Sequence, residues 1–63
     1  MHRNAEDARQ DAMGSLAALI ADYDEAIVRA YEAREWATRA RLLAERDKAT
    51  AELRALEAAK VAS

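Results

Sequence analysis

Small apolar residues recur along the middle of the chain at intervals that alternate between three and four residues. The recurring positions are Leu16, Leu19, Tyr23, Ala26, Ala30, Ala33, Ala37, Ala40 and Ala44. A repeat that averages 3.5 residues predicts an α-helix whose apolar stripe packs against another helix in a coiled coil. We call these nine residues the alanine seam.

Alanine at the core positions of a coiled coil predicts close approach of the two helices. Large core side chains hold helix axes about 8–10 Å apart, and alanine allows the lower end of that range. The seam resembles the packing class known as the Alacoil, in which the helices run antiparallel. This resemblance implies an antiparallel homo-oligomer, either a dimer or a small bundle.

Larger apolar residues lie beside the seam and on a second face of the predicted helix. Ile20 and Ile27 flank the seam on one side, and Trp36 flanks it on the other together with Leu43. Beyond Asp47 the apolar positions rotate by roughly 140°, at ~100° per residue, onto a second face. That face contains Leu42, Ala49, Leu53 and Leu56. Two apolar faces predict a bundle of several helices or a second binding partner, with Ile20, Ile27, Trp36, Leu43, Leu53 and Leu56 as candidate partner-binding residues.

Helix-forming residues dominate the chain, which has no proline and a single glycine, and an all-α fold is therefore predicted. Asn4, followed by Asp7, predicts a helix start near Ala5. Gly14 either ends a short N-terminal helix or frayed arm over residues 1–14 or lies inside an uninterrupted helix. From 15 to 63 we expect one long amphipathic helix. It is either continuous or folded back into a hairpin near 45–48, where a polar segment interrupts the seam.

Size and charge favour self-association. The chain has 63 residues, enough for one domain, and 18 of its 33 hydrophobic residues are alanines that bury little area. It has no cysteine, so disulfides cannot reinforce the fold. Residues 1–25 carry a formal charge of −4 and residues 26–63 carry +2. This asymmetry favours antiparallel over parallel pairing of helices.

The sequence offers little for catalysis or for holding a cofactor or metal. His2 is the only histidine, and the Glu-x-x-His pairs of helical metal sites are absent. Over about a quarter of the chain, the spacing is similar to that of the first long helix of helical chorismate mutases, at Ile20, Tyr23, Asp24, Ile27 and Arg34. Ala17 and Glu45, however, stand where that family has arginine and lysine. We expect no enzyme, cofactor, metal or small-molecule substrate.

The preferred hypothesis is a cytoplasmic, non-enzymatic interaction module that binds itself and regulates another protein, with no membrane segment. The alternative is a dimeric RNA- or DNA-binding regulator that uses a face formed by Arg34 and Arg41. Small two-helix plasmid regulators of the RNA-binding Rop type are similar in length and packing style.

Overall fold

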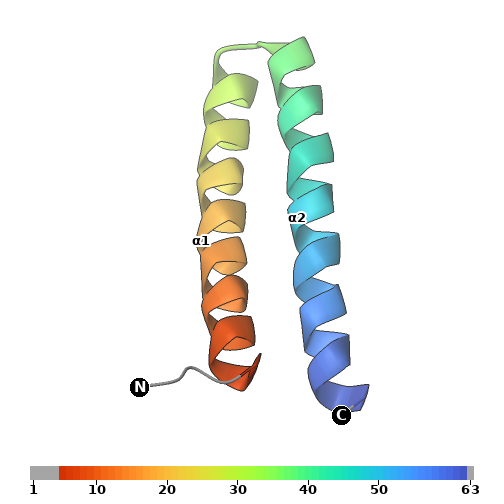
Figure 1. Ribbon diagram of the computed structural model, residues 1–63. Coiled ribbons are helices and arrows are strands. Elements are labelled where there is room, and N and C mark those ends of the chain that lie inside the picture. The colour runs from red at the N-terminus through yellow and green to blue at the C-terminus, as the bar shows by residue number, and fades with distance from the viewer. Residues whose placement is uncertain (1–4, 63) are drawn as a thin grey trace.

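Two antiparallel α-helices make up the chain in the computed structural model, which describes the backbone of residues 5–62 and the side chains of residues 5–59. Helix α1 spans Ala5–Glu32 and helix α2 spans Trp36–Ala62. The helices lie side by side along their length, with the start of α1 and the end of α2 at the end opposite the turn (Figure 1). The hairpin measures 48 × 25 × 12 Å and is therefore a single layer of helices. The expected all-α fold is confirmed, in its hairpin form.

Each helix turns one stripe of side chains toward the other. The inward positions of α1 are Met13, Leu16, Ile20, Tyr23, Ile27 and Ala30, and those of α2 are Arg39, Leu42, Arg46, Ala49, Leu53 and Leu56. Both stripes follow the alternating three- and four-residue spacing of a coiled coil. Among the residues with described side chains, only Ala30 and Ala49 are buried, at 4% and 5% exposure. The larger inward side chains are only half-buried.

The helix-to-helix turn occupies residues 33–35 and closes with a Schellman motif. The Glu35 N–H donates to the Ala30 carbonyl at 2.8 Å, and the Arg34 N–H donates to the Tyr31 carbonyl at 3.0 Å. Arg34 adopts a left-handed backbone with φ of 59°. These two bonds satisfy carbonyls that the end of α1 would otherwise leave without partners. The Glu35 carbonyl then accepts the first hydrogen bond of α2, from the Arg39 N–H at 2.9 Å.

The structure corrects the expected helix boundaries. Helix α1 begins at Ala5 as predicted, but it continues through Gly14, so no separate helix ends there. Helix α2 likewise continues through residues 45–48, where the turn was predicted. The polar side chains there do not break the helix because glutamate, arginine and lysine are good helix formers, and of the four residues only Arg46 belongs to the inward stripe, directly before Ala49. Asn4, the predicted capping residue, and His2 lie outside the described residues.

Candidate interaction surfaces

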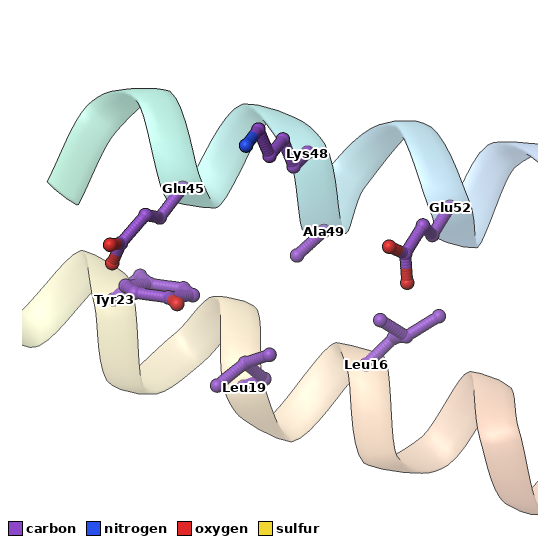
Figure 2. A pocket seen from close by; sticks show the side chains of 7 residues that line it. All are labelled: Leu16, Leu19, Tyr23, Glu45, Lys48, Ala49 and Glu52. Atoms are coloured by element: carbon purple, nitrogen blue, oxygen red, sulfur yellow. The ribbon is translucent and has the colours of Figure 1, made fainter. Parts of the chain in front are cut away.

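A groove runs between the helices on one broad side of the hairpin, which we call the groove face. Its central hollow of about 280 Å³ is lined by Leu16, Leu19, Tyr23, Glu45, Lys48, Ala49 and Glu52. Figure 2 shows the α1 side chains facing Ala49 and the two glutamates of α2. A second hollow of about 500 Å³, lined by Ala12, Ser15, Leu16, Glu52, Ala55 and Leu56, shares Leu16 and Glu52 with the first. The groove is therefore continuous from Tyr23 toward the open end of the hairpin.

Tyr23 crosses the groove face and meets Glu45 of the other helix (Figure 2). Loss of hydration at this site raises the pKa of the Tyr23 hydroxyl above its ordinary value of 10.0. The negative charge of Glu45 and the hydrogen bond that the hydroxyl donates to it raise the pKa further. These effects favour the neutral phenol at this end of the groove.

The opposite broad side, which we call the aromatic face, presents exposed apolar side chains near the turn. It comprises the exposed Ala17, Ala21, Val28 and Tyr31 of α1, and the exposed Trp36 and Ala40 and the half-buried Leu43 of α2. These positions share one side of each helix because they are separated by three, four or seven residues, or by sums of these. Val28, Tyr31 and Trp36 are 56%, 58% and 55% exposed.

Aromatic contacts join the two helices on the aromatic face. The rings of Tyr31 and Trp36 meet edge to face, with centroids 5.6 Å apart and planes inclined by 71°. The Arg39 guanidinium lies 5.5 Å from the centroid of the Tyr31 ring, within the range of a cation–π interaction. On the same side, Arg46 Nε lies 2.8 Å from Asp24 Oδ1 and pairs the helices near their middle. The exposed aromatic side chains therefore contact residues of both helices.

The structure divides the alanine seam between different sides of the hairpin. Leu16, Tyr23 and Ala30 belong to the inward stripe of α1, Ala26 is half-buried beside it, and Leu19 is 42% exposed on the groove face. Ala33 lies in the turn, and Ala37, Ala40 and Ala44 are exposed on α2. The prediction of one continuous stripe from residue 16 to residue 44 is therefore wrong within a single chain, because the turn at 33–35 reorients every residue after it. Contact of the exposed alanines with another molecule stays a prediction.

The six candidate partner-binding residues also separate into two groups. Ile20 and Ile27 lie half-buried in the contact between the helices, as do Leu53 and Leu56. The second apolar face predicted from the sequence is thus the inward face of α2. Trp36 and Leu43 lie on the aromatic face, where Trp36 remains accessible. Of this set, Trp36 is the large side chain most available to another protein.

The two arginines of the alternative nucleic-acid face do not share a helix. Arg34 belongs to the turn, and Arg41 is exposed on α2. Their spacing of one heptad would place them on one face of a continuous helix, but the left-handed backbone at Arg34 ends that periodicity. The exposed platform of Val28 and Tyr31 was not predicted, although the seven-residue spacing of Ala21 and Val28 and of Trp36 and Leu43 was a usable signal.

Over residues 5–62, the structure shows no helix long and apolar enough to cross a membrane. Among the same residues, no group of three or more histidine, cysteine, aspartate or glutamate side chains is arranged to hold a metal ion. Comparisons of this chain with protein-family models, with curated proteins and with solved structures find no match.

Proposed function

We propose that this chain is a cytoplasmic, non-enzymatic interaction module that associates with itself and binds and regulates a partner protein. The observation that supports this proposal is the incomplete burial of the hairpin. Among the described side chains only two alanines are buried, while Val28, Tyr31 and Trp36 are more than half exposed. Helical stability comes mainly from packing of the apolar face, so further packing partners are needed to cover these side chains.

The groove face is the surface that we assign to the partner protein. Its hollows have an apolar floor that includes Leu16, Leu19 and Leu56, which suits the apolar side of an amphipathic helix. Glu45 and Glu52 line the groove together with one cation, Lys48. We therefore assign the partner a helix with basic residues beside its apolar anchors, because these would pair with the two glutamates.

Solution mass tests the self-association. Sedimentation equilibrium should give a mass of at least two chains of 7.0 kDa at micromolar to millimolar concentration. The melting temperature should rise with chain concentration, since association stabilises only the folded state. A folded monomer whose melting temperature is the same at every concentration would overturn the proposal.

Affinity capture with a groove variant tests the partner surface. Wild-type chain should retain one protein in a fixed ratio, and Leu19→Lys should lose it because the added charge stands in the groove. Val28→Lys, on the aromatic face, is the matched control. It should still retain the partner protein, because the added charge stands outside the groove. Equal capture by wild type and Leu19→Lys would show that the partner binds elsewhere.

Nucleic-acid binding is the competing outcome. Tight binding to RNA or DNA that weakens steeply with added salt, and that is lost on Arg41→Glu, would support the regulator hypothesis in place of the protein-binding one. If the chain binds neither RNA nor DNA at low salt, the nucleic-acid-binding hypothesis is excluded.

A further inference from the structure

The hairpin is a single layer of two helices, with no second layer packed on either broad face within the part of the chain that the structure describes. It is 12 Å thick, the thickness of one helix, whereas stable domains bury apolar faces between at least two layers. Its accessible surface is 4928 Å². A compact monomer of the same mass exposes about 4,000 Å², so the excess of about 900 Å² is close to the roughly 800 Å² that each partner contributes to a standard interface. One further layer of similar size would therefore complete the fold.

The aromatic face is better suited than the groove face to receive that layer. It holds three of the four large hydrophobic residues that are exposed among the described residues, namely Val28, Tyr31 and Trp36. Tyrosine and tryptophan are enriched at the energetic centre of protein interfaces. The groove face holds only Leu19 of this group, and its walls carry Glu45, Lys48 and Glu52. Covering the aromatic face thus removes more large apolar side chains from water than covering the groove face, and Asp24 and Arg46 on this side are already paired with each other.

The charges of the two helices select the identity and direction of the second layer. Helix α1 carries seven acidic residues and two arginines, a formal charge of −5, and α2 carries six basic and four acidic residues, a charge of +2. Two hairpins stacked with their turns at the same end place each α1 on the other copy's α2, so that unlike charges face each other. Stacking with the turns at opposite ends places α1 on α1. Complementary charge across an interface fixes its orientation in this way.

The distribution of apolar residues along the hairpin favours the same orientation. With the turns together, Val28 and Tyr31 of one copy lie over Trp36 and Leu43 of the other. With the turns apart and the helices fully overlapped, the aromatic end would cover the part of α2 that carries Thr50, Arg54 and Glu57 on this side. A two-fold axis parallel to the helices therefore brings apolar side chains together and makes the contact self-complementary.

We propose that a second copy of this chain docks on the aromatic face, with both turns at the same end, to form a four-helix bundle in which each α1 packs on the other copy's α2. This inference rests on the proposed function, which requires self-association but neither this face nor this orientation. In the bundle, the groove face of each copy remains outward and accessible to the partner protein.

Two variants on the same helix test the face. Val28→Lys places a charge at the proposed centre of the interface, and Leu19→Lys makes the same type of change on the groove face, where Leu19 is 42% exposed. Sedimentation equilibrium should show two chains for wild type and for Leu19→Lys, and at least a tenfold weaker dimer for Val28→Lys. A wild-type dimer that Leu19→Lys separates and Val28→Lys preserves would overturn the assignment of the face while leaving self-association intact. A wild-type monomer would instead overturn the proposed function itself.

A distance measurement tests the orientation in the wild-type background and does not depend on the folding of Val28→Lys. The chain has no cysteine, so Glu32→Cys supplies one attachment site for a spin label, near the turn. With the turns together, the two labels should be a few helix spacings apart, on the order of 30 Å. With the turns apart, their separation should approach the 48 Å length of the hairpin. Ala8→Cys, at the open end of α1, should also give a short distance in the proposed bundle, and long distances for both labels would overturn it.

Discussion

The ring of Tyr31, in the last turn of α1, meets the ring of Trp36, the first residue of α2, edge to face across the hairpin turn at 5.6 Å. Residues five apart along one continuous helix would not face each other in this way. The contact exists because the turn between them folds the chain back. It joins the end of one helix to the start of the other, directly beside the strained residue Arg34.

The aromatic contact should contribute measurably to stability. In a double-mutant cycle with Tyr31→Leu and Trp36→Leu, we expect a coupling free energy of about 0.5–1.5 kcal/mol, the usual value for such ring pairs. Urea unfolding at one fixed chain concentration measures it, since association also affects the apparent stability. Strictly additive losses would show that the two rings do not stabilise each other.

Replacing the left-handed residue of the turn should stabilise the hairpin. Arg34 has φ of 59°, a conformation that costs a non-glycine residue about 1–2 kcal/mol and costs glycine almost nothing. After allowing for the greater freedom of glycine in the unfolded chain, Arg34→Gly should raise the free energy of unfolding by about 0.5–1 kcal/mol. Glu32→Gly, two residues earlier and inside the helix, is the matched control and should lower it. A loss of stability in Arg34→Gly would contradict the Schellman geometry.

Enlarging an alanine should be costly only where the structure buries it. Ala49 is 5% exposed between the helices, and Ala49→Leu should force them apart and cost about 1–3 kcal/mol. Ala37 is exposed, so Ala37→Leu should change the stability of the hairpin by less than about 0.5 kcal/mol. Thermal melting at one concentration compares the two variants. A large effect of Ala37→Leu would mean that a second molecule covers that part of the alanine seam.

The Tyr23 hydroxyl should make the hairpin sensitive to alkali. Its pKa is raised in the folded chain, so the stability that the neutral phenol provides is complete below pH 10.0 and is lost as the pH rises through the folded pKa. Tyr23→Phe should remove this component, which appears as a shallower fall in melting temperature above pH 10.0 than in the wild type. Tyr31→Phe retains Tyr23 and serves as the control. Identical alkaline profiles for Tyr23→Phe and the wild type would show that the contact with Glu45 carries no stability.

Replacing the chain's single glycine, Gly14, with alanine should also stabilise the fold. Gly14 lies inside α1 without a positive φ, and a Cβ at this position meets nothing within 4 Å. Gly14→Ala should therefore raise the free energy of unfolding by about 0.5–1 kcal/mol through helix propensity. The reverse change at an exposed position of the same helix, Ala18→Gly, should lower it by a similar amount. A destabilising Gly14→Ala would reveal close packing at Gly14 in the assembled form.

The sequence alone determined that the chain is helical and that its apolar residues follow a coiled-coil repeat. Alanine, leucine, glutamate and arginine favour helix at nearly every position, and the ion pair from Glu25 to Arg29 forms at 2.7 Å as its four-residue spacing allows. The rotated stripe that contains Leu42 and Leu53 was also visible, and it proves to be the side of α2 that faces α1.

Only the tertiary structure decided where the chain reverses and which residues remain exposed. Residues 33–35 contain no glycine, proline or asparagine, so local propensity gives no sign of a turn at Arg34. The chain turns there because the stripes before and after it can bury each other only when the second helix is folded back onto the first. That long-range packing outweighs the local cost of a left-handed arginine, and it moves Ala37 and Ala44 out of the contact while leaving Val28, Tyr31 and Trp36 open to a partner.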